Sequence, residues 1–169
     1  MLTGDFGYST QYKRQVVDVI GTPMVNTLIL NALSMVVTFV IAIPLGIATA
    51  VRKNSVFDKF VQVITIVGYS LPSFIIALLF IFMFSVKIPV FPISGVRSAG
   101  FSGNGFELVL DTLWHMALPV IVMSISGIGS ITRYVRAEMI DVLRMDYIKT
   151  ARAKGLKEKT VIYVHAFRN

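Results

Sequence analysis

Three long runs without a charged residue dominate this sequence. No Asp, Glu, Lys or Arg occurs in residues 19–51, 60–86 or 112–132. An α-helix needs roughly 20 mostly apolar residues to cross the hydrocarbon core of a bilayer, and each run reaches that length. Three such runs in one short chain are hard to reconcile with the buried helices of a soluble protein. The runs therefore predict an all-α, polytopic membrane protein with about three transmembrane helices.

The composition agrees with this class and excludes several others. Of the 169 residues, 55% are hydrophobic and only 15% are charged, and the mean hydropathy is +0.75, outside the range of ordinary soluble domains. The absence of cysteine excludes a disulfide framework and a thiolate metal site. We find no Gly-rich phosphate loop, no Ser/His/Asp constellation and no second histidine near His115. We therefore expect no enzyme activity, no metal and no directly bound cofactor.

The basic residues are unevenly distributed around the three runs. Twelve of the 16 Lys and Arg residues lie in the segments 52–59 and 133–169. The positive-inside rule makes those segments cytoplasmic. The N-terminus and the 87–111 loop would then be outside and the C-terminus inside. Because the charge of +7 sits beside membrane spans, it indicates contact with membrane lipids and no role in binding nucleic acid.

The pattern divides the chain into three parts. Residues 1–24 form a polar extracytoplasmic segment with turn-like breaks at "GDFGYS" and "IGTP". Residues 25–132 form the transmembrane region, and residues 133–169 form a cytoplasmic tail. The spans are expected at about 25–51, 60–86 and 112–132.

Prolines and small polar residues interrupt the apolar spans. A proline removes a backbone donor and kinks a helix, and in lipid the released carbonyl must find another partner. One proline in each span suggests bent helices around a polar path, with plain packing irregularity as the alternative. In "SISGIGS", residues 124–130, small residues four apart favour close helix packing more than pore lining. The candidate pathway or packing residues are Pro44, Pro72, Ser73, Pro119, Ser126 and Ser130.

No span carries an ionisable residue that would mark a proton or ion route, as many ion-coupled carriers do. The energy for any transport would therefore have to come from elsewhere.

The tail "RMDYIKTARAKGLKEKTVIYVHAFRN", residues 144–169, is polar, basic and helix-prone. Asp146 is a candidate N-cap for a two-turn helix over residues 147–154. Gly155 suits the left-handed position that ends a helix, and a second helix should follow from about residue 157. Such a tail could simply meet anionic lipid. A slim, capped helix would also suit insertion into a groove on a cytoplasmic partner.

The runs "DYIKTARAKGL" and "VHAFRN" resemble the cytoplasmic loop of permease subunits of binding-protein-dependent ABC importers. The closest similarity is to the dipeptide/oligopeptide and nickel permease family, which "GDFGYS", "IPLGI", "SLPSF" and "LWHMALPV" also resemble. In such permeases the loop carries a Glu-Ala-Ala-x-x-x-Gly pattern, of which only Ala151 and Gly155 match here. The likeness extends over nearly the whole chain.

The resemblance implies a type I ABC importer permease fold, with residues 146–156 as a coupling helix seated on an ATP-binding subunit. The implied contact residues are Asp146, Tyr147, Ala151, Arg152 and Gly155. Further implied partners are a second permease subunit and an extracytoplasmic solute-binding protein, and ATP and Mg would be used by the partner ATPase. Members of the family have further spans on both sides of the matching region, so the resemblance also implies that this chain is a fragment.

We therefore expect a permease subunit that imports peptides or a similar solute across the cytoplasmic membrane. The alternative is a non-transporting membrane anchor, or an inactive permease fragment, whose basic tail binds a partner or anionic lipid. An independent channel would need a continuous polar helix face, and the spans present no clear one.

Overall fold

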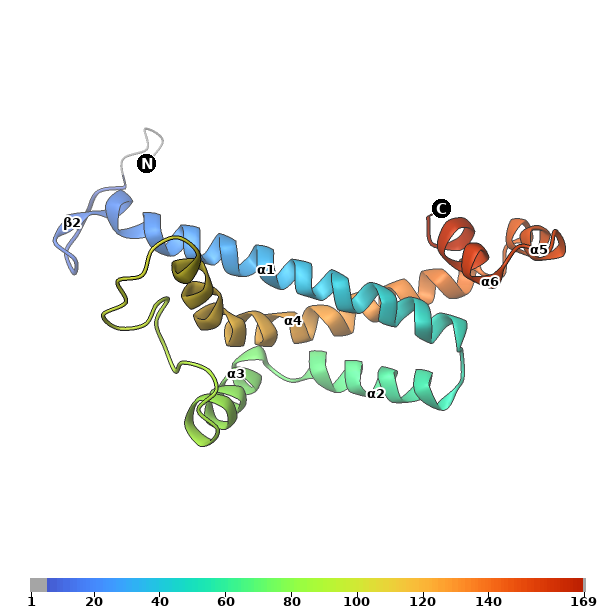
Figure 1. The fold of residues 1–169 in the computed structure, drawn as a ribbon, viewed down its shortest axis with the longest axis horizontal. Helices are drawn as coiled ribbons and strands as arrows, with labels where there is room; N and C mark the ends of the chain where they lie inside the picture. Colours follow the sequence, from blue (N-terminus) through green and yellow to red (C-terminus); the bar gives the residue numbers. More distant parts are fainter. Residues whose placement is uncertain (1–5, 169) are drawn as a thin grey trace.

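The computed structural model describes residues 6–168, and most of them lie in helices (Figure 1). This confirms the predicted all-α class. The first five residues of the predicted segment 1–24, and Asn169, lie outside the described residues. The helices are α1 (Val16–Val51), α2 (Val56–Ser70), α3 (Ser73–Ile81), η1 (Phe82–Lys87), α4 (Phe106–Val142), α5 (Asp146–Ala153), α6 (Glu158–Thr160) and η2 (Val161–Ala166), where η marks a π-helix.

Helix α1 begins earlier than the sequence predicts, so the non-helical N-terminal segment is shorter than the predicted residues 1–24. A two-stranded antiparallel hairpin, β1 (Tyr8–Ser9) with β2 (Arg14–Gln15), leads directly into α1. The turn-like break predicted at "IGTP" is wrong, because α1 begins at Val16 and runs through Pro23. Thr27 donates its hydroxyl to the Pro23 carbonyl at 2.9 Å, so a side chain adds a hydrogen bond beside the proline.

The second predicted span, residues 60–86, is not one straight helix. The axes of the two helical halves on either side of residues 71 and 72 differ by 97°. Leu71 and Pro72 both have extended backbone angles at the break, as expected where a proline disfavours helix at the residue before it. Among residues 6–168, two helices, α1 and α4, are long and apolar enough to cross a membrane, and the bent pair adds a third only if its halves count as one span.

Helices α1 and α4 lie side by side and run in the same direction, with α2 beside them in the opposite direction (Figure 1). Glycines allow the close approach. A Cβ added at Gly46 would meet the Val135 side chain at 2.8 Å, and one at Gly129 would meet the Thr65 carbonyl at 2.8 Å. The close packing predicted from "SISGIGS" is confirmed at Gly129 and at Gly127, which faces Thr38.

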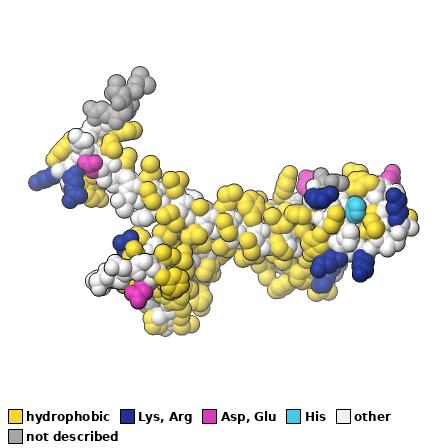
Figure 2. Space-filling model, turned by 45° about the horizontal axis from the view of Figure 1, so that its top comes forward, with side chains coloured by type: hydrophobic (Ala, Val, Ile, Leu, Met, Phe, Trp, Pro, Cys, Tyr) yellow, Lys and Arg dark blue, Asp and Glu magenta, His cyan; other side chains and the backbone are white. Residues whose placement is uncertain are grey.

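The hydrophobic core lies where α1 and α4 end, against the tail. A buried hydrophobic cluster joins side chains from α1, α4, α5 and η2. Its members are Ile47, Ala50, Met139, Ile148, Ala151, Val161, Ile162 and Ala166. Figure 2 shows that Lys and Arg gather at this end of the molecule, whereas the middle is covered by hydrophobic side chains. We call the region around this cluster the inner end, after the cytoplasmic side that its basic residues predict.

Candidate functional site

The helix predicted at residues 147–154 is α5, Asp146–Ala153. The N-cap is Met145, which has an extended backbone and makes no side-chain cap hydrogen bond, so the predicted N-cap at Asp146 is wrong. Helical geometry begins one residue earlier than expected, which places Asp146 inside the first turn. Its carboxylate there suits the positive end of the helix dipole and accepts a hydrogen bond from Lys149 at 2.8 Å.

The C-terminus of α5 agrees with the sequence prediction. Gly155 has a φ of 74°, a left-handed conformation that glycine adopts without a steric penalty. The Gly155 N–H donates to the Arg152 carbonyl at 2.9 Å, and the Leu156 N–H donates to the Ala151 carbonyl at 3.4 Å. This pair of bonds is a Schellman motif, which satisfies carbonyls that a helix end leaves open. The motif turns the chain sharply into the next helix.

An ion pair between Arg152 and Glu158 joins the two sides of the turn at Gly155. The Arg152 guanidinium lies 2.6 Å from the Glu158 carboxylate, and a second hydrogen bond joins them at 3.2 Å. The hydrogen bonds from Arg152 hold the pKa of the Glu158 carboxyl below its usual value. Both side chains are about half exposed, so the pair guides the geometry of the turn more than it stabilises the fold. The second helix predicted from about residue 157 is present as α6 and η2.

The two faces of α5 have different surroundings. Ile148 is fully buried and Ala151 is 6% exposed, both within the inner-end cluster. Tyr147 is 43% exposed, on the face of α5 that points away from the cluster. Asp146, Arg152 and Gly155 are also exposed. The structure thus leaves four of the five predicted contact residues open to a partner and turns the Ala151 side chain toward the chain's own core.

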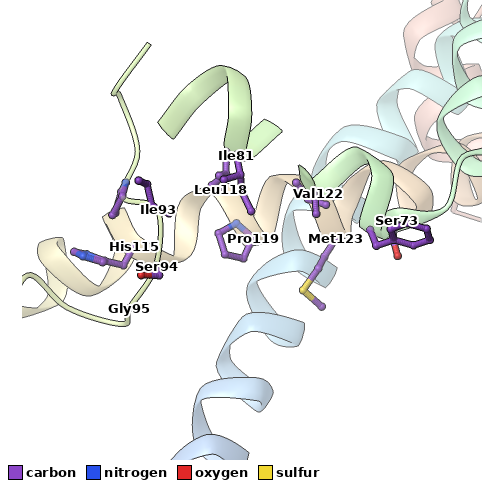
Figure 3. A pocket seen from close by; sticks show the side chains of 13 residues that line it. Ser73, Ile81, Ile93, Ser94, Gly95, His115, Leu118, Pro119, Val122 and Met123 are labelled. Carbon is purple, nitrogen blue, oxygen red and sulfur yellow. The ribbon is translucent and has the colours of Figure 1, made fainter. Parts of the chain in front are cut away.

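Two of the six candidate pathway residues meet in one cavity at the opposite end from the tail (Figure 3). Ser73 and Pro119 both line a cavity of about 420 Å³ between α3, α4 and the loop at residues 92–95. Most of the lining is apolar. His115 adds a buried ring whose Nδ1 lies 2.8 Å from the Asp111 carbonyl. We call this the outer cavity.

The other four candidates do not join that cavity. Ser130 lines a second space of about 580 Å³ with Gln62, Tyr69, Arg133 and Arg136 among its neighbours. Ser126 is half-buried, and its carbonyl accepts a hydrogen bond from the Ser130 hydroxyl at 3.1 Å. Pro44 is exposed on α1, and Pro72 lies at the break between α2 and α3. Three of the six candidates therefore line two separate cavities, and the other three line neither, so a polar path stays a prediction.

One charged constellation lies outside all of the sequence-predicted sites. Arg136 donates two hydrogen bonds to the carboxylate of Asp58, at 2.6 and 2.7 Å. In the sequence both residues count only as charges beside an apolar run. A carboxylate two residues before such a run is the one available signal, and it does not reveal a partner 78 positions away.

The chain is similar to known transport proteins over nearly its whole length. Residues 42–169 match the family described as binding-protein-dependent transport system inner membrane component. The chain is 36% identical over 170 residues to the oligopeptide transport system permease protein AppB of Bacillus subtilis, covering 100% of this chain and 52% of that protein.

Two further relatives agree. The chain is 37% identical over 168 residues to the peptidoglycan transport system permease protein YejB of Agrobacterium fabrum, covering 98% of this chain and 46% of that protein. It is 34% identical over 186 residues to the dipeptide transport system permease protein DppB of Escherichia coli K12, covering 100% and 55%. The chain thus spans about half the length of these relatives. It belongs to the family of inner-membrane components of binding-protein-dependent transport systems.

Proposed function

We propose that this protein is a permease subunit of an ABC importer that carries peptides across the cytoplasmic membrane. The family match over residues 42–169 carries the proposal, because it includes α5 and every member of the buried cluster in which α5 packs. The relatives named above are permeases for oligopeptides, dipeptides and peptidoglycan. Their shared chemistry supports a peptide as the solute.

On this proposal α5 is the contact with an ATP-binding subunit. Its buried face is fixed to the ends of α1 and α4, and its exposed face carries Tyr147, Lys149 and Arg152. A helix anchored on one side and open on the other suits insertion into a groove on a partner. ATP and Mg are bound and used by that partner, and α5 passes its movement to the membrane helices.

The orientation follows from charge. The inner end, with most of the Lys and Arg residues, faces the cytoplasm. The outer cavity then faces the side from which an extracytoplasmic binding protein delivers the solute. A second permease subunit completes the path.

The experiment compares two glycines with the same backbone angle. Gly155 and Gly100 each have a φ of 74°, and a Cβ added at either would meet nothing within 4 Å, so valine introduces the same local strain at both. Gly155→Val should uncouple ATP hydrolysis from uptake of tritiated trialanine by the assembled transporter, with membrane insertion unchanged. Gly100→Val, in the outer loop, should transport as the wild type does. Normal uptake by an inserted Gly155→Val protein, or equal losses in both variants, would refute the proposal.

A further inference from the structure

Asp58 is the most completely enclosed charged side chain among residues 6–168. It is 0% exposed although it carries a carboxylate. Besides the two bonds from Arg136, it accepts one from the Asn54 N–H at 2.9 Å and one from the Gln62 amide at 3.1 Å. The Asp58 N–H is itself held by the Ser55 hydroxyl at 3.1 Å. Both carboxylate oxygens are therefore fully used, as a buried carboxylate requires.

The pair connects elements that are far apart in the chain. Asp58 lies in the first turn of α2 and Arg136 lies on α4. Among residues 6–168, this is the ion pair that joins two of the long helices, since the other pairs lie within one helix or within the tail. A bidentate arginine–carboxylate contact fixes orientation as well as distance. The pair therefore resists sliding of α2 along α4.

Arg136 lies on α4 close to the residues that pack against the tail. Arg136 lies one turn before Met139, whose side chain packs in the inner-end cluster with Ile148 of α5. At the other end, α2 leads to the break at Pro72 and from there to α3, which lines the outer cavity. The ion pair thus stands between the helix that carries α5 and the helix that leads toward the cavity.

We propose that Asp58 and Arg136 are positioning residues that make α2 move together with α4 when α5 is displaced. This rests on the proposed function, in which α5 receives movement from an ATPase. Without the ion pair, α4 and α5 can still move, but the movement of α2, and of α3 beyond the break at Pro72, is coupled more weakly to theirs. ATP is then hydrolysed with less transport.

The test separates positioning from simple stabilisation. A single change at Asp58 or Arg136 leaves a buried charge without its partner and strongly destabilises a fold. Changing both residues to amides removes both charges, and an amide can both donate and accept hydrogen bonds at the site. The double variant Asp58→Asn with Arg136→Gln should therefore melt close to the wild type. In the assembled transporter it should move fewer trialanine molecules per ATP, by about fivefold or more. The matched control is Lys59→Gln with Asp141→Asn, which neutralises two exposed charges on the same helices.

A wild-type ratio of trialanine to ATP in the stably folded double variant would overturn the proposal, because it would leave the pair a purely structural role. An equal loss in the control variant would also overturn it, since the effect would then follow charge in general.

A second readout does not depend on transport. The chain has no cysteine, so spin labels can be placed on the protein at Val56→Cys in α2 and Lys154→Cys beside α5, both exposed positions. The distance between the two spin labels should have one narrow distribution in the wild type. This distribution should broaden in the Asp58→Asn, Arg136→Gln variant and not in the control variant. If the wild type moved no peptide but the distribution still broadened, the proposed function would fail and the rigid connection would stand. An unchanged distribution would overturn the connection itself.

Discussion

The inner and outer ends of this molecule are built differently. At the inner end, four helical elements bury a common hydrophobic cluster, and the Asp58–Arg136 pair adds a polar connection beside it. At the outer end, the loop at residues 88–105 is mostly exposed. It is tied to α4 by Ser98, whose hydroxyl donates to Asp111 at 2.6 Å, and by the Phe91 ring, which packs at a tilt against Trp114. Buried hydrophobic packing is therefore concentrated at the inner end, whereas the outer end has a cavity.

The largest expected effect lies in the inner-end cluster. Ile148→Ala removes a fully buried side chain that holds α5 against α1 and α4. Such a truncation typically lowers the free energy of unfolding by about 2–5 kcal/mol. Thermal unfolding of the purified protein in detergent measures it. Tyr147→Ala, one residue away on the exposed face, should leave the melting temperature within error. Equal melting temperatures for Ile148→Ala and the wild type would mean that α5 is not docked as described.

A smaller effect is expected where α1 and α4 touch. A Cβ at Gly46, near the inner end, would lie 2.8 Å from the Val135 side chain and 2.9 Å from the Thr132 carbonyl. Gly46→Ala should therefore lower stability by about 1–3 kcal/mol through overpacking.

The same substitution at Gly21, near the outer end of α1, meets nothing within 4 Å. Gly21→Ala should leave stability unchanged or raise it by up to about 1 kcal/mol, since alanine is the better helix former. If both alanine variants melted alike, the contrast in packing between the two ends of α1 would be contradicted.

The sequence predicts those features that depend on local pattern. Long charge-free runs require helices, and Gly155 ends α5 because few other residues adopt its backbone angle. The predicted position of the N-cap is wrong by one residue. Met145 has no side chain that can cap a helix, and only its extended backbone marks where α5 begins.

Features that depend on distant contacts could not be predicted. The 97° break at Pro72 is signalled by the proline only as a kink of unstated size. The pairing of Asp58 with Arg136 and the burial of Ala151 both arise when segments remote in sequence pack together. Likewise, Ser73 and Pro119 share the outer cavity because the bend brings α3 beside α4.

In the proposed transporter, the exposed face of α5 meets an ATP-binding subunit on the cytoplasmic side of the membrane. Labelling single cysteines with a membrane-impermeant maleimide tests it most directly, with Tyr147→Cys on α5 compared with Ser102→Cys in the outer loop. In intact spheroplasts only Ser102→Cys should react. In inverted vesicles Tyr147→Cys should react, and the bound ATP-binding subunit should protect it. Labelling of Tyr147→Cys from the outside, or no protection by that subunit, would rule out this contact.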